Sequence, residues 1–180
     1  KPFTGTLGMT EDGRLFRFCE AGGVALVASE MQQAFVPEAD TLAETVGTMA
    51  AGVTVLTGVG ATTGTQAANL HQRGYVFSPT SADLNPVYRI KSHTAITQGA
   101  ETGTITLYSP TVAAIAAAST LSFIRNLWKD ILVAPATTPT AMVLGVCVRA
   151  IALDAFGWIQ SRGVASVLCG NITYVIGDPV

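Results

Sequence analysis

The segment DGRLFRF, at Asp12–Phe18, decides the fold class of this chain. It opens with an Asp-Gly pair, and glycine supplies the positive backbone φ that a tight reversal of the chain requires. Large apolar side chains follow the pair, and further apolar residues precede it within the stretch Thr6–Glu20. Two such runs around a turn predict a β-hairpin centred on Glu11–Gly13.

Short strand patterns separated by turn residues recur along the rest of the chain. They lie at Gly52–Val59, Arg73–Ser78, Val87–Ser92, 104–110, Met142–Leu153, Phe156–Gln160, Val164–Cys169 and Ile172–Ile176. Only the alanine-rich stretch Thr111–Ser119 favours a short helix by its intrinsic propensity. We therefore expect a mainly β fold, with β-sandwich-like or barrel-like lobes of short strands and at most one or two short helices.

Alternation along two of these strands predicts which side chains share a face, because successive side chains of a strand point to opposite sides. In the strand expected at Gly52–Val59, one face should hold Val53, Val55 and Val59. In the strand expected at Val87–Ser92, one face should hold Val87, Arg89 and Lys91, and the other face should hold Tyr88 and Ile90.

The length of 180 residues suits one structural unit, or two small lobes that share a core. We expect one lobe to combine residues 1–45 with residues 140–180, and a second lobe to span 52–133. The segment Pro135–Thr140, PATTPT, has the proline and threonine content of a connecting segment, so residues 134–140 are expected to form a linker. Residues 37–51 are expected to form a further connection.

The composition predicts a surface that a partner covers. Only 12% of the residues are charged and 49% are hydrophobic, which leaves mainly small and weakly polar side chains for the surface. A net charge of −2 and a pI near 5.6 provide no cluster of cations for phosphates, so direct nucleic-acid binding is not expected. No apolar run approaches the roughly 18 residues that a membrane span needs, so no membrane contact is expected either.

The titratable and nucleophilic residues predict neither a catalytic site nor a cofactor. Cys19, Cys147 and Cys169 are far apart and odd in number, which favours reduced, buried thiols over disulfides or zinc ligands. The two histidines, His71 and His93, are expected at the surface or in turns, and no G-x-S-x-G motif accompanies them. We expect a non-enzymatic protein without metal or cofactor, although scattered carboxylates leave a hydrolase open.

A set of strand-and-turn motifs carries a resemblance that extends over most of the chain. These motifs are DGRLFRF, AGGVALVASEM, RGYVFSP, YRIKSHTAI, TGTITLYSP, NLWKDILVAP and GWIQSRGVASVLCGN, with VIGDPV at the end. The chain resembles a family of tailed-bacteriophage virion structural proteins, of the head decoration, or cement, type. The resemblance implies a protein on the outside of the icosahedral head that stabilises the capsid lattice after assembly in the host cytoplasm.

The resemblance also implies partners. These are the major capsid protein and further copies of this chain, with a trimer favoured over a dimer. The polar N-terminus is a candidate arm that contacts the capsid, formed by Lys1, Pro2, Phe3, Thr4, Gly5 and Thr6. Candidate interface residues are Arg14, Arg17, Arg89, Lys91 and Trp128. The alternative is a receptor-binding or glycan-binding module of a tail or head fibre.

Overall fold

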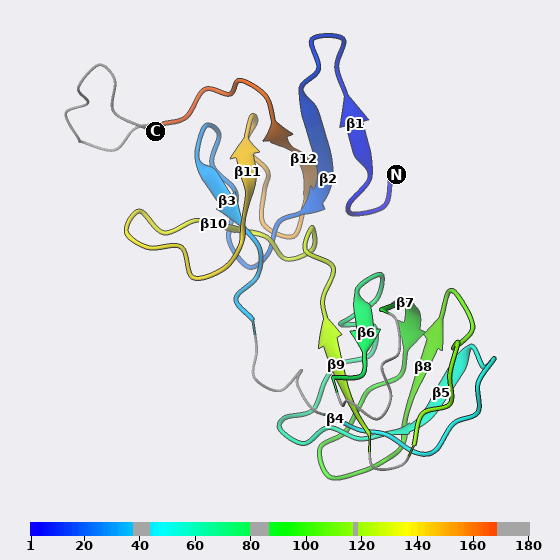
Figure 1. Cartoon of the computed structure of the whole chain (residues 1–180). Helices are drawn as coiled ribbons and strands as arrows, with labels where there is room; N and C mark the ends of the chain where they lie inside the picture. Colours follow the sequence, from blue (N-terminus) through cyan, green and yellow to red (C-terminus); the bar gives the residue numbers. More distant parts are fainter. Residues whose placement is uncertain (38–43, 80–86, 117–118, 169–180) are drawn as a thin grey trace. The chain divides into compact units, whose positions relative to one another are not determined.

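The computed structural model describes residues 1–37, 44–79, 87–116 and 119–168, and over these residues the protein is all-β (Figure 1). It contains two antiparallel six-stranded sheets and, within the described residues, no helix, so none that could span a membrane. The mainly β prediction is therefore confirmed. Two compact units share the chain: Lys1–Val36 with Trp128–Val180 form unit 1, and Pro37–Leu127 form unit 2.

Unit 1 begins with the predicted hairpin. Strand β1 (Leu7–Met9) pairs antiparallel with β2 (Leu15–Glu20), and Leu7 lies opposite Arg17. Gly13 has a φ of 80° in the turn, which is the left-handed conformation that glycine adopts without steric cost.

The rest of the unit 1 sheet is assembled from distant parts of the chain. Its order is β1-β2-β12-β11-β3-β10 (Figure 1). The further strands are β3 (Met31–Gln33), β10 (Leu132–Val133), β11 (Val143–Cys147) and β12 (Phe156–Arg162). The apolar core includes Cys19, Leu26, Ile131, Cys147 and Ile159, all at most 1% exposed.

Unit 2 contains the second sheet, in the order β4-β9-β6-β7-β8-β5. Its strands are β4 (Glu44–Thr45), β5 (Val55–Val59), β6 (Tyr75–Phe77), β7 (Tyr88–His93), β8 (Gly103–Leu107) and β9 (Thr120–Ile124). The sheet curls until its first and last strands approach, because Thr45 and Gly60 exchange backbone hydrogen bonds of 3.1 and 3.2 Å. Unit 2 is thus barrel-like, with an inner and an outer face.

The inner face of this curled sheet holds the core of unit 2. Its buried apolar side chains come from five of the strands, β5 to β9, and from the segments beside them, and include Val46, Leu56, Val76, Ile90, Ile105, Leu107, Leu121 and Phe123. On β7 the predicted alternation is confirmed, since Tyr88 and Ile90 are buried and Arg89 and Lys91 are exposed. The outer face of the same strands is left to solvent.

The unit boundaries differ from the expected lobe boundaries. The segment 134–140, expected to be a linker, lies inside unit 1, where it joins β10 to β11. Both of these strands pair with β3, and the Gln33 side-chain amide donates to the Thr140 hydroxyl at 2.8 Å. The second lobe, expected at 52–133, occupies residues 37–127, because β4 belongs to its sheet and β10 does not.

Three local predictions are wrong, and one of them is the strand expected at Val164–Cys169, because its described residues, 164–168, form no strand. No helix forms in the described part of Thr111–Ser119; Ile115 instead makes a β-bridge to Met49, with backbone bonds of 2.8 and 2.9 Å. The strand β5 buries Leu56 and exposes Val55, the reverse of the predicted face, and a bulge between Leu56 and Val59 lets both of these residues be buried although they are an odd number of positions apart. Cys169 and the strand expected at Ile172–Ile176 lie outside the described residues.

Candidate functional site

Four exposed side chains form a row across the outer face of the unit 2 sheet. Tyr75 on β6 lies opposite Ile124 on β9 and opposite Arg89 on β7. The backbone N–H of Tyr108 donates to the carbonyl of Arg89 at 3.0 Å, which continues the row next to β8. Ile124, Tyr75 and Tyr108 are 42%, 43% and 49% exposed. We call these four residues the outer row.

The outer row combines apolar area with positive charge. The Arg89 guanidinium lies 5.3 Å from the centre of the Tyr108 ring, a cation–π arrangement that extends the side chain along the sheet. Lys91, two residues further along β7, is also exposed. Among the described residues, no carboxylate lies within 4.0 Å of the Arg89 or Lys91 cation.

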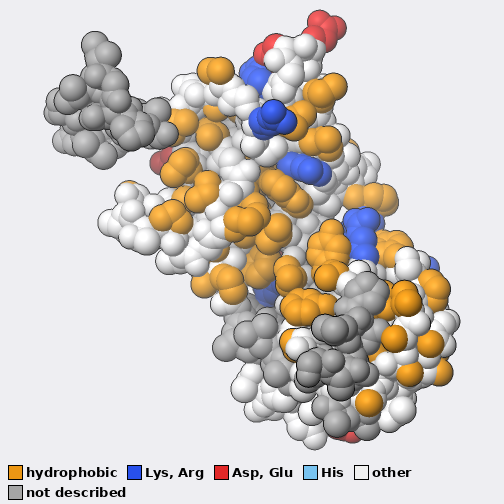
Figure 2. Space-filling model, viewed as in Figure 1, with side chains coloured by type: hydrophobic (Ala, Val, Ile, Leu, Met, Phe, Trp, Pro, Cys, Tyr) orange, Lys and Arg blue, Asp and Glu red, His pale blue; other side chains and the backbone are white. Residues whose placement is uncertain are grey.

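Two further exposed aliphatic side chains lie on or beside strands of the same sheet. Val87 is 61% exposed beside β7, and Val55 on β5 is 43% exposed. Monomeric proteins rarely present large contiguous apolar patches unless a partner or ligand covers them. Figure 2 shows the same composition more widely, with many hydrophobic and few charged side chains on the visible surface.

The N-terminal segment 1–6, the candidate arm for contact with the capsid, packs against its own unit. The N–H of Gly5 donates to the carbonyl of Phe18 at 2.7 Å, and the N–H of Phe18 donates to the carbonyl of Thr6 at 3.0 Å. The Lys1 ammonium lies over the Phe156 ring. The segment therefore extends the pairing of β1 with β2, while Phe3 remains 63% exposed.

Arg17 and Trp128, both candidate interface residues, form a small cluster with the N-terminal segment in unit 1. Arg17 donates from Nη1 to the carbonyl of Gly5 at 2.8 Å and lies 5.5 Å from the centre of the Trp128 ring. Gly5 has a φ of 90°, and a Cβ atom there would approach Trp128 to 3.0 Å. The cluster thus anchors the N-terminal segment, with the indole half-buried.

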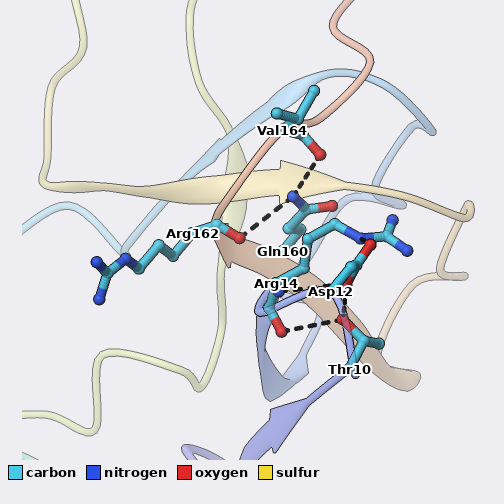
Figure 3. Close-up of polar contacts among 6 residues, drawn as sticks. All are labelled: Thr10, Asp12, Arg14, Gln160, Arg162 and Val164. Carbon is cyan, nitrogen blue, oxygen red and sulfur yellow. Dashed lines mark hydrogen bonds and ion pairs between the residues drawn. The ribbon is translucent and has the colours of Figure 1, made fainter.

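Arg14, the fifth candidate, belongs to the turn between β1 and β2. Its Nε forms an ion pair of 2.7 Å with Asp12 Oδ2 (Figure 3). The Thr10 hydroxyl donates to the other carboxylate oxygen and, with the bonds from Arg14, holds the pKa of Asp12 below its usual range. Arg14, Arg17 and Trp128 therefore belong to unit 1, whereas Arg89 and Lys91 belong to unit 2.

A buried glutamine holds the chain that follows β12. The Gln160 amide donates to the carbonyls of Arg162 and Val164 at 3.2 and 2.8 Å (Figure 3). Gln160 is 3% exposed, whereas Val164 is 90% exposed. The amide therefore fixes the path of an exposed loop from inside the unit.

Two histidines lie inside unit 2: His71 is in a turn, as one of the two predicted placements has it, but neither histidine lies at the surface. His71 is 0% and His93 is 5% exposed, and their ring centres are 5.4 Å apart. The other face of the His71 ring stacks on Phe123, at 5.1 Å. His71 forms a hydrogen bond with the Gln66 side chain. His93 donates from its backbone N–H to the Asn69 side chain and forms a hydrogen bond through Nδ1 with the carbonyl of Thr94.

The described residues contain no group of three or more His, Cys, Asp or Glu side chains arranged to hold a metal ion. Comparison of the chain with protein-family models, with curated proteins and with solved structures finds no match. The sequence predicted part of the outer row, because it gave Arg89 as a candidate interface residue and showed which side chains of β7 share a face. The rest of the row depends on strand pairing.

Proposed function

We propose that this protein is a structural component of a tailed-phage particle that binds the outside of the capsid and stabilises the capsid lattice. The outer row of unit 2 is the surface that would bind the capsid. The observation that carries this proposal is a continuous, exposed line of Ile124, Tyr75, Arg89 and Tyr108 across four neighbouring positions of one sheet. The resemblance of the sequence motifs to virion structural proteins supports the choice of partner.

The chemistry of the outer row specifies the partner's surface. Exposed tyrosine and arginine are enriched in protein interfaces, where they bury apolar area and retain polar bonds. Arg89 and Lys91 lie among apolar groups and lack a described carboxylate within 4.0 Å. The complementary surface is therefore an acidic protein surface with apolar area around its carboxylates, supplied by the capsid subunits.

The backbone structure of unit 2 suits a rigid docking element. The curled sheet positions the outer row by strand pairing, with the core packed beneath it. A rigid surface loses little conformational freedom on binding, so more of the contact energy contributes to affinity. Many copies on one closed lattice would add multivalency, and self-association into trimers would strengthen each attachment.

The first test is cryo-electron microscopy of purified particles that contain this protein. We expect density for this chain at regular positions over the capsid, with unit 2 against the capsid subunits. Density restricted to the tail or to fibres would contradict the proposal and would favour the receptor-binding or glycan-binding alternative. Absence from the particle would reject both.

Reversal of the charge at Arg89 tests whether the outer row is the surface that binds the capsid. Arg89→Glu places a carboxylate against an acidic partner, and the number of copies retained per particle should fall by about tenfold or more. The matched control is Arg149→Glu, which makes the same charge change at an exposed residue of unit 1. Copy number is measured by quantitative mass spectrometry of purified particles. Equal retention of the two variants would reject the outer row as the docking surface.

A further inference from the structure

A chain of hydrogen bonds links the buried polar side chains of unit 2. The Gln66 amide nitrogen donates to Glu44 Oε1 at 3.1 Å, and the backbone N–H of Thr62 donates to the other carboxylate oxygen. His71 Nε2 lies 2.8 Å from Gln66 Oε1, and the backbone N–H of His71 lies 3.0 Å from His93 Nε2. Glu44, Gln66, His71 and His93 are all at most 5% exposed.

The partners of His93 determine its protonation state. A backbone N–H can only donate, so His93 Nε2 must carry the lone pair that accepts from His71 at 3.0 Å. A backbone carbonyl can only accept, so His93 Nδ1 must carry the proton that is donated to Thr94 at 2.7 Å. His93 is therefore the neutral Nδ1–H tautomer in this fold.

The orientation of Gln66 similarly assigns one nitrogen of His71. Because the Gln66 nitrogen donates to Glu44, its oxygen faces His71 Nε2, which must then be the donor. His71 accordingly binds to Glu44 through Gln66, and His93 binds to the backbone of His71. His71 and Glu44 are the titratable groups that this chain of bonds places around His93.

We propose that His93 makes unit 2 acid-labile, so that unit 2 keeps its fold, and with it the outer row, only while His93 is neutral. Protonation of Nε2 would set two donors against each other, since the His71 N–H already points at that atom. It would also place a charge in a buried site beside the His71 ring, 5.4 Å away. This inference concerns folding and does not depend on the docking role.

The sign of the pH dependence follows from proton linkage. The folded unit excludes the proton from His93, whereas the unfolded chain binds it with the ordinary histidine pKa of about 6.5. Stability is therefore complete above about pH 6.5 and is lost progressively as the pH falls below it. Carboxyl groups ordinarily titrate near pH 4, so the window between about pH 6.5 and 5 reports the two buried histidines, and substitution of each one separates His93 from His71.

The test is native-state hydrogen exchange of the full-length protein, measured by mass spectrometry and corrected for the intrinsic pH dependence of exchange. Peptides from β6–β8 should open more readily at low pH, with the opening equilibrium constant rising about tenfold per pH unit below about pH 6. Peptides from β2 and β12 of unit 1 serve as the internal control and should show no such rise. An equal response in both units would overturn the proposal.

The variant His93→Gln separates titration from hydrogen bonding. Its side-chain oxygen can accept from the His71 N–H but does not titrate, so the acid-dependent opening of unit 2 should be less steep in this variant, with only the contribution of the other buried histidine, His71, remaining. The matched control His71→Gln removes the neighbouring histidine and should retain the His93 dependence. Acid opening that is as steep in His93→Gln as in the unmodified protein would overturn the proposal.

A measurement on the unmodified protein decides the question even where a variant fails to fold. Long-range ¹H–¹⁵N correlation spectra distinguish neutral histidine tautomers from the imidazolium ion. We expect His93 in folded protein to give the neutral Nδ1–H pattern at about pH 6, below the ordinary histidine pKa. An imidazolium pattern for His93 in folded protein at that pH would contradict the proposal.

Discussion

The two units bury different polar side chains. Unit 1 buries Gln32, Gln33 and Gln160, whose amides do not titrate, and unit 2 buries Glu44, His71 and His93, whose charges depend on pH. Both sets serve the same structural purpose, because their buried side chains form hydrogen bonds with backbone groups and neighbouring side chains.

Two β units of one chain can therefore respond differently to pH. An amide satisfies its partners over the whole pH range, whereas an imidazole that accepts a hydrogen bond does so only while it is neutral. The buried thiols add a contrast, since both described cysteines belong to unit 1. Unit 2 should therefore be sensitive to acid, and unit 1 to alkali.

The largest effect is expected from removal of the buried carboxylate of unit 2. Glu44→Ala leaves the Thr62 N–H and the Gln66 amide without the acceptors they use, and should lower the free energy of unfolding by about 2–5 kcal/mol. Gln160→Ala in unit 1 should cost only about 1 kcal/mol, because the carbonyl of exposed Val164 can bind water instead.

Urea denaturation measures both of these changes. The control is Glu101→Ala, at an exposed position of unit 2, which should change the free energy of unfolding by less than about 0.5 kcal/mol. If Glu44→Ala costs no more than this control, the carboxylate does not support the fold of unit 2, and the contrast between the units is lost.

Alkaline pH should destabilise unit 1 selectively. Burial raises the pKa of the Cys19 thiol from 9.0 to about 12, and burial also raises that of Cys147. Because the folded state disfavours the thiolate, this stability is complete below pH 9.0 and is lost as the pH rises toward about 12. The loss from Cys19 should be about 1.4 kcal/mol per pH unit within this window.

Hydrogen exchange measures this loss within one sample, when the exchange of peptides from β2 and β12 in unit 1 is compared with that of peptides from β6–β8 in unit 2. Residues 37–127 contain no cysteine, so unit 2 provides the control for thiol ionisation. Cys19→Ala should flatten the alkaline dependence of unit 1, although it also removes packing volume. Equal alkaline opening of the two units would show that another group is responsible.

The smallest effects are expected at a matched pair of turn glycines. Gly13 in unit 1 and Gly52 in unit 2 have φ values of 80° and 82°, with no atom within 4 Å of an added Cβ. Alanine at either position should cost about 1 kcal/mol, from backbone strain alone.

The control for this pair is Gly23→Ala, which has the same open space without the left-handed φ. It should be nearly neutral in thermal unfolding, because alanine fits its backbone without strain. Unequal costs for Gly13→Ala and Gly52→Ala would show that the two turns differ in rigidity, which would sharpen the comparison of the units.

Local features of the fold could be predicted from the sequence, because their causes lie within a few residues. The Asp-Gly turn determines the hairpin of β1 and β2, and alternation determines which side of β7 is buried. The bulge in β5 was missed, since an inserted residue is specified by the partner strand as much as by the strand itself. The same reason applies to Ile115, whose bridge to Met49 overrides the helix propensity of its alanine neighbours.

The β class, the hairpin, the buried face of β7 and the choice of Arg89 as a candidate interface residue all follow from the amino-acid sequence. The folded structure was needed to show that β12 pairs with β2, that Tyr75 and Tyr108 flank Arg89, and that His93 accepts a bond from His71. Strand partners come from any distance along the chain, and their choice depends on the packing of the whole unit, which no local pattern encodes. Protonation and exposure follow from those partners, so they too are properties of the folded unit.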